Sequence, residues 1–250
     1  MFVAASTRCF SNLPLDEALQ RLVDLEYTAV EICIHESGGH LKPSEVVRDF
    51  ERAVQICRKT QRLTPIAYSV DIETDDESEY YQQFQACCRL AKATKVVTIS
   101  VRSAELGTPF NAEIERLQEL VRLAAIESAV VGLVTETGRM TQDPATATVF
   151  CNNVKGLALT LDPSHYIYGP HQGGPYEPVM KHVCHVRLRD TTKEMFQVRV
   201  GQGQIEYGRL VTQLAMVQYN RALCVDIEPI PDVDQNAEMR KVRLLLESLL

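Results

Sequence analysis

Residues 95–102 of the sequence read KVVTISVR, and this stretch decides the class of fold. From Val97 to Arg102 apolar and polar side chains alternate, and the apolar residues are mostly β-branched, as is typical of a strand. One face of such a strand would pack on helices, and the other would enter a polar space. The same alternation occurs over residues 29–35 and 183–189. The pattern therefore predicts strands whose polar faces meet in one interior.

The rest of the chain repeats this element with helices in between. The eight predicted strands lie near residues 2–6, 29–35, 64–70, 95–101, 131–137, 157–162, 183–189 and 222–228. Most of the intervening stretches have apolar residues every three to four positions, as amphipathic helices do. Strands that alternate with helices predict a parallel sheet. Eight units in 250 residues fit a single (β/α)8 TIM barrel, which we expect to form one domain over residues 1–250.

Composition and charge limit the partners of this chain. Hydrophobic residues make up 45% of it, and 26 basic against 33 acidic side chains give a net charge of −7. We expect no nucleic-acid partner, because such partners select basic surfaces, and no membrane segment or secretory leader. The eight cysteines never form a CxxC pair. We interpret them as buried reduced thiols of a cytoplasmic protein.

Ionisable side chains lie at the carboxyl ends of four predicted strands. Glu136, Asp162, Arg187 and Glu228 occupy late positions in strands five to eight, and His165 follows strand six. The active sites of such barrels lie at this end of the strands. Because unpaired buried charge costs several kcal/mol, these groups need compensating partners, and a divalent metal would supply one.

Each of these residues also has a purely structural interpretation. Glu136 could bridge to an inward arginine such as Arg187, and Asp162 could cap a helix or turn. His165 could be a hydrogen-bonded turn histidine, and Glu228 a solvated carboxylate at a strand end. Their coincidence at neighbouring strand ends favours a shared site.

The sequence resembles the xylose isomerase-like TIM barrels over nearly its whole length. That family includes sugar and sugar-phosphate isomerases and epimerases, and the apurinic endonucleases related to them. The resemblance is carried by Glu31, Glu136, the turn at 162–165, the segments 185–190 and 201–205, and Glu228. In this order and at these strand ends, the residues are specific for the superfamily but not for one reaction.

The resemblance implies a divalent metal, Mn²⁺, Mg²⁺ or Zn²⁺, held by Glu136, Asp162, Glu228 and a histidine of strand seven. The run at 185–190 reads HVRLRD, which places Arg187 where that histidine is expected. An arginine cannot ligate a cation. The site would therefore use three carboxylates, recruit His165 or His185 as a fourth ligand, or hold Arg187 in the metal's place.

The chemistry that the resemblance implies is proton transfer through an enediolate, which isomerises or epimerises a small sugar, sugar phosphate or keto acid. Glu136 and Glu228 would be the acid–base pair, and His165 would donate to the oxyanion. Arg187 would bind an acid or phosphate group. His185 is a further candidate for substrate binding, although the strand pattern places it lower in the barrel as a hydrogen-bonded core residue.

Two other functions compete with this hypothesis. The first is a barrel with a degraded metal site that binds a sugar-like or polyol ligand without turnover. The second is a metal-dependent phosphoesterase or endonuclease, which would need more histidines than the strand ends offer. The sequence leaves open whether the chain forms a homo-oligomer.

Overall fold

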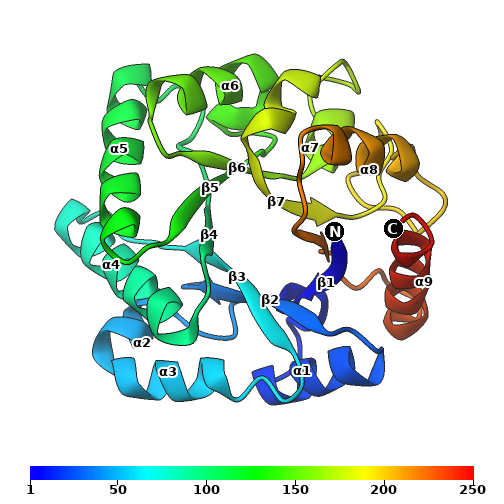
Figure 1. The fold of residues 1–250 in the computed structure, drawn as a ribbon, viewed down its shortest axis with the longest axis horizontal. Coiled ribbons are helices and arrows are strands. Elements are labelled where there is room, and N and C mark those ends of the chain that lie inside the picture. Colours follow the sequence, from blue (N-terminus) through cyan, green and yellow to red (C-terminus); the bar gives the residue numbers. More distant parts are fainter.

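The computed structural model describes all residues 1–250 as a closed barrel of eight parallel strands (Figure 1). Each strand pairs with the next along the chain, and β1 closes the barrel on β8. The predicted fold is therefore confirmed. The strands are β1 Phe2–Ser6, β2 Ala29–His35, β3 Thr64–Asp71, β4 Thr98–Val101, β5 Val130–Val134, β6 Ala158–Leu161, β7 Val183–Leu188 and β8 Ala222–Val225.

Helices connect the strands and form the outer ring that Figure 1 shows. They are α1 Leu15–Asp24, α2 Pro43–Arg48, α3 Phe50–Arg58, α4 Glu77–Thr94, α5 Phe110–Ile126, α6 Pro144–Asn153, α7 Pro163–Tyr168, α8 Tyr207–Met216 and α9 Gln235–Glu247. Short 3-10 helices are η1 Thr7–Phe10, η2 Met140–Gln142 and η3 Glu177–His182. None of the helices combines the length and apolar character that a membrane span requires.

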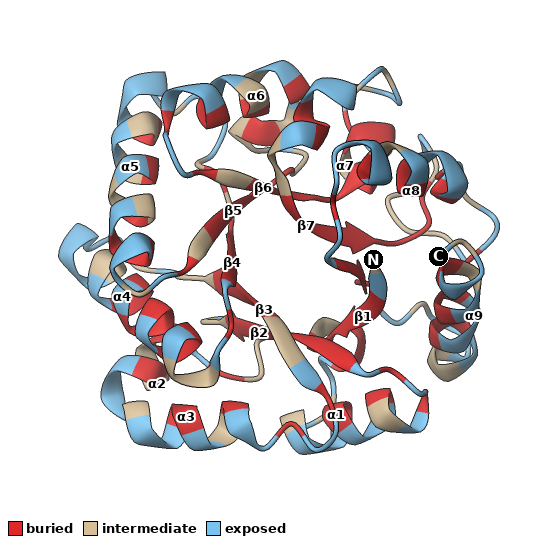
Figure 2. Cartoon of the chain, in the orientation of Figure 1, coloured by how far each residue is buried: buried red, intermediate tan, exposed pale blue.

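The alternation of side chains along β4 separates the core from the lumen. Ile99 and Val101 are buried in the large apolar cluster between strands and helices. Ser100, of the opposite parity, hydrogen-bonds Thr160 of β6 across the lumen at 2.7 Å. Figure 2 shows the buried residues concentrated on the strands and on the helix faces that meet them. At the level of Ser100 and Thr160 the lumen is thus polar, and an apolar shell surrounds it.

The last four strands end earlier than the sequence predicts, and the difference is largest for β5 and β8. β5 ends at Val134 and not near residue 137, and β8 ends at Val225 and not near residue 228. The last residue of β8 pairs with Ala5 of β1 and Leu188 of β7. Asp226 is therefore the first residue beyond β8, and Glu228 lies on the loop that follows.

Candidate functional site

A cavity of about 240 Å³ opens at the carboxyl ends of the strands. Its charged lining comprises four arginines, Arg8, Arg102, Arg187 and Arg189, and four carboxylates, Asp71, Glu136, Asp162 and Glu228. His35, His165 and Phe196 complete the functional part of the wall. The structure thus brings five predicted site residues to one cavity: Glu136, Asp162, His165, Arg187 and Glu228. The sixth, His185, does not line it.

Arg189 joins the ends of β6 and β8 through two carboxylates. Its Nη2 donates to Asp162 Oδ2 at 2.8 Å and to Asp226 Oδ2 at 2.7 Å. Arg8, just beyond β1, donates from Nε and Nη2 to the two oxygens of Asp226 at 3.0 and 2.8 Å. Burial raises the pKa of Asp226, but Arg8 and Arg189 outweigh burial and hold that pKa well below its usual range. Asp226 is therefore ionised, and ion pairs link Arg8, Asp226, Arg189 and Asp162 in one row.

Asp162 has a second, local role, which matches its structural interpretation. It is the N-cap of α7, where its Oδ1 accepts from the Ser164 amide at 3.1 Å and from the Ser164 hydroxyl. Pro163 follows at the first helical position, where no amide hydrogen is needed. Both oxygens of Asp162 are thus occupied, one by its own helix and one by Arg189.

Glu136 pairs with Arg102 of the loop after β4, not with Arg187. Arg102 Nε donates to Glu136 Oε2 at 2.9 Å, and Arg102 Nη2 donates to the other oxygen. The third nitrogen of the guanidinium, Nη1, donates to Asp71 Oδ2 at 3.2 Å. Burial raises the pKa of Glu136, but the hydrogen bonds and charge of Arg102 lower it by more. Glu136 is consequently ionised at neutral pH.

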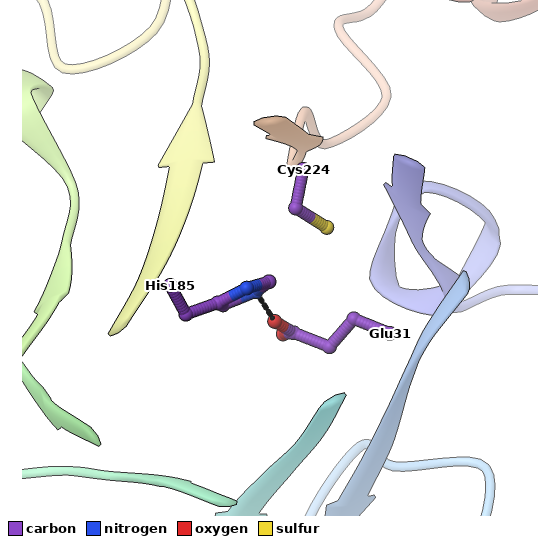
Figure 3. Close-up of side chains that lie close together, drawn as sticks. All are labelled: Glu31, His185 and Cys224. Atoms are coloured by element: carbon purple, nitrogen blue, oxygen red, sulfur yellow. Dashed lines mark hydrogen bonds and ion pairs between the residues drawn. The ribbon is translucent and has the colours of Figure 1, made fainter. Parts of the chain in front are cut away.

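A second charged layer lies deeper in the lumen. Glu31 of β2 accepts a hydrogen bond from His185 Nε2, and Arg187 Nη2 lies 2.7 Å from Glu31 Oε1. Figure 3 shows Glu31, His185 and Cys224 pointing toward one another from β2, β7 and β8. Burial raises the pKa of Glu31, yet Arg187 and His185 lower it to about 2. His185 is thus the buried partner of Glu31, which agrees with its expected core position and explains why it does not reach the cavity.

His165 is held as a neutral hydrogen-bond donor. The Thr137 amide donates to His165 Nδ1 at 3.1 Å, and an amide N–H can only donate. The neutral ring must therefore carry its proton on Nε2, which lies 3.8 Å from Asp162 Oδ2. Burial lowers the pKa of His165 even though Asp162 opposes the shift. The ring of Phe196 lies 4.5 Å from the His165 ring and 4.5 Å from the Arg189 guanidinium carbon, and so covers both.

The carboxylate after β8 that pairs with Arg8 and Arg189 is Asp226, which the sequence analysis missed, whereas Glu228 lines the cavity. The Glu228 side chain is 59% exposed, and its nearest cation, Arg8 Nε, is 3.7 Å from Oε1. The Asp226 side chain is 2% exposed. The two residues share the same strand parity, so alternation alone does not distinguish them. The same alternation predicts that Asp226 faces inward as Glu228 does, and it is the sequence signal from which Asp226 could have been found.

The strand-end residues do not fit the divalent metal that the resemblance implies. Glu136 is held by Arg102, and both oxygens of Asp162 are hydrogen-bonded. His165 Nδ1 already accepts a hydrogen bond from the Thr137 amide, and Nε2, which carries the hydrogen, faces Asp162. A cation would have to displace an arginine from a buried ion pair, which costs several kcal/mol.

One other group of side chains has the composition of a metal site. Ligand atoms of Glu31, His185 and Cys224 all lie within 4.8 Å of one another. Arg187 contacts the same carboxylate and opposes a cation there by its charge. Burial also raises the pKa of the Cys224 thiol, whereas a metal ligand must be the thiolate. Glu31, His185 and Arg187 therefore form a buried network of charged and polar groups, and the Cys224 thiol lies beside it.

The chain is a (β/α)8 barrel, and its charged side chains gather at the carboxyl ends of the strands. Proteins of this class have their functional sites at that end. Comparison of sequence families makes the assignment finer. The model of the xylose isomerase-like TIM barrel family matches residues 19–247, and the chain belongs to that family. No curated protein gives a significant match to the sequence.

Solved structures share the fold at low sequence identity. A xylose isomerase domain protein from Alicyclobacillus acidocaldarius is 15% identical, with a TM-score of 0.80 over 100% of this chain and 98% of that chain. The apo 3-keto-D-glucoside 4-epimerase from E. coli is 14% identical, with a TM-score of 0.75 over 99% of each chain. A family member from Mycobacterium smegmatis in complex with magnesium is 13% identical, with a TM-score of 0.76 over 99% and 97% of the two chains.

Proposed function

We propose that the protein is an isomerase or epimerase that moves a proton at a carbon next to the carbonyl of a small sugar-like substrate. The observation that carries this proposal is the neutral His165, whose proton is fixed on Nε2 at the wall of a cavity that also holds the ionised Glu136. Membership of the family and the epimerase among its structural neighbours support the same class of reaction.

The site residues divide the work of such a reaction. His165 Nε2–H donates to the substrate carbonyl and stabilises the negative oxygen that forms as the proton leaves. The guanidinium groups of Arg102 and Arg189 add positive charge to the same wall. Glu136 lies just after β5 and Glu228 on the loop after β8, and these two lining carboxylates are the proposed pair that removes and returns the proton.

The charges of the lining favour an uncharged sugar over a sugar phosphate. Four arginines face four carboxylates, so the wall carries no excess of positive charge. Arg187, the expected phosphate ligand, is paired with Glu31. A polyol ketone or aldehyde can exchange hydrogen bonds with such alternating donors and acceptors without needing a free cation. A shallower hollow of about 600 Å³ shares Asp71 and Arg102 with the cavity and leaves room for a substituent on that sugar.

Exchange of carbon-bound hydrogen with solvent tests the proposal. Ketoses, aldoses, keto acids and their phosphates are incubated with the protein in D₂O, and deuterium at carbon is followed by NMR. Glu136→Gln should lower the rate of exchange by about 100- to 10,000-fold, as loss of a positioned base does. Glu119→Gln, on the surface of α5, is the matched control and should leave the rate unchanged.

The competing function is a barrel that binds a sugar without turnover. One observation favours it: Arg102 engages both oxygens of Glu136 and lowers its pKa, which weakens Glu136 as a base. Wild-type protein that binds a sugar by calorimetry, but exchanges no carbon-bound hydrogen in any member of the panel, would establish this alternative and refute the isomerase.

A further inference from the structure

We infer that Arg189 replaces the divalent cation at the mouth of this barrel, so that the strand-end carboxylates are balanced by the chain itself and bind no metal ion. The geometry around one atom carries this inference. Oxygens of Asp162 and Asp226, from the ends of β6 and β8, converge on Arg189 Nη2 at 2.8 and 2.7 Å. All three side chains are 2% exposed. Carboxylates from two strands that converge on one buried positive centre are the arrangement that otherwise surrounds a metal.

The charges of this group already sum to zero. Asp162 and Asp226 contribute two negative charges, and Arg8 and Arg189 contribute two positive charges. Arg8 occupies both oxygens of Asp226, and Ser164 occupies the remaining oxygen of Asp162. A divalent ion added here would find no free carboxylate oxygen and would leave two positive charges uncompensated in a buried place.

The position of Arg189 is fixed independently of the carboxylates. The side chain comes from the residue directly after β7, and its guanidinium lies 4.5 Å from the ring centre of Phe196. An arginine stacked on an aromatic ring is attracted to the face of that ring and loses freedom to swing away. A metal ion arriving from solvent would therefore have to displace a side chain held by two carboxylates and a ring.

Titration with Mn²⁺ tests the inference without reference to turnover. Purified native protein is treated with EDTA, dialysed and titrated with MnCl₂ by calorimetry. Its thermal unfolding midpoint is then measured with EDTA and with 1 mM Mn²⁺. This concentration is about the dissociation constant of the weakest metal sites in proteins. We expect no binding and the same midpoint in both solutions. One equivalent of Mn²⁺ bound with micromolar affinity, or a midpoint that falls on chelation, would overturn the inference.

The variant Arg189→Met tests the converse, that removal of the arginine creates a metal site. It keeps most of the side-chain volume, removes the positive charge, frees Asp162 Oδ2 and leaves Asp226 Oδ2 with Arg8 as its one donor. The variant should bind Mn²⁺ at least tenfold more tightly than the 1 mM limit set for the native chain, because a repulsive charge is removed and Asp162 Oδ2 becomes available. Mn²⁺ should also raise its thermal midpoint. Adding Asp162→Asn to the variant should abolish the gain, which would place the ion between the two strands.

A matched control separates this effect from the loss of any arginine. Arg209 on α8 also touches two carboxylates, Glu177 and Glu206, but all three are exposed. Arg209→Met should not change the affinity for Mn²⁺. If Arg189→Met folds and gains no affinity, the inference is wrong; if it does not fold, the titration of the native chain still decides. A failed exchange assay would refute the proposed reaction while leaving this result intact.

Discussion

Neutralising Glu31 should destabilise the barrel more than the loss of any surface carboxylate. Glu31→Gln keeps the shape of the side chain and one acceptor oxygen, but it removes the negative charge and turns the other oxygen into an N–H donor facing Arg187 and His185 in a buried layer of the lumen. The Glu31 side chain is 1% exposed and that of Arg187 is 8% exposed, so water cannot replace the lost interaction. Breaking one partner of a buried ion pair costs about 3–5 kcal/mol.

The lowered pKa of Glu31 leads to a cost of similar size by a second argument. Its pKa falls from an ordinary value of 4.5 to about 2 on folding. At 1.36 kcal/mol per pKa unit, this shift corresponds to about 3 kcal/mol of stability above pH 5. Because the folded pKa is the lower one, the contribution is lost as pH falls from 4.5 towards 2. The difference in stability between the native chain and Glu31→Gln should therefore be about 3 kcal/mol at pH 7 and about half of that at pH 3.

Urea denaturation at pH 7, 5, 4 and 3, followed by circular dichroism, measures this difference. Glu119→Gln is the control, because Glu119 pairs with Arg122 on the exposed face of α5 and should not move the transition detectably. A cost below about 1 kcal/mol at pH 7 would refute the argument from buried charge. A cost that does not depend on pH would show that packing, and not the ionised carboxylate, accounts for the loss.

Two further predictions concern the fold. Gly203→Ala should lower the free energy of unfolding in urea by several kcal/mol, because an added Cβ would overlap the Asp190 carboxylate, which accepts from the Gly201 and Gly203 amides. Gly208→Ala in α8, where the atom nearest the added Cβ is 3.9 Å away, should be neutral or slightly stabilising. Equal effects of the two changes would contradict the steric argument. All eight cysteines are free and buried, so a thiol reagent such as Ellman's should label almost none within minutes in the native chain and all eight in urea; rapid labelling of any native thiol would contradict the burial.

The sequence predicted the barrel well because its signals are local. Alternation along 98–101 and apolar periodicity along the helices depend only on neighbouring residues, and each strand pairs with the next. The predicted gathering of Glu136, Asp162 and Arg187 at one mouth follows from the same logic, since parallel strands present their carboxyl ends together. Their roles in a reaction stay predictions.

The pairing of charges could not be predicted in this way. Arg102 and Arg187 both face inward, and only the assembled barrel decides that Arg102 holds Glu136 while Arg187 holds Glu31. Asp226, and not Glu228, is held by Arg8 and Arg189, which reach it from the ends of β1 and β7 only in the assembled barrel. Arg8 reaches Asp226 from a position 218 residues away in the chain.

The ion pairs across the lumen also bear on how the barrel assembles. Arg187 of β7 forms an ion pair with Glu31 of β2, and Arg8, just after β1, forms one with Asp226, just after β8. A chain folded only through β1–β4 would bury Glu31 without its cations, and one folded only through β5–β8 would bury Arg187 without its anion. Either half must keep its lumen hydrated until the other arrives. Desolvation of these charges therefore belongs to a late event in folding, when the first and last strands meet and the two halves become one cooperative unit.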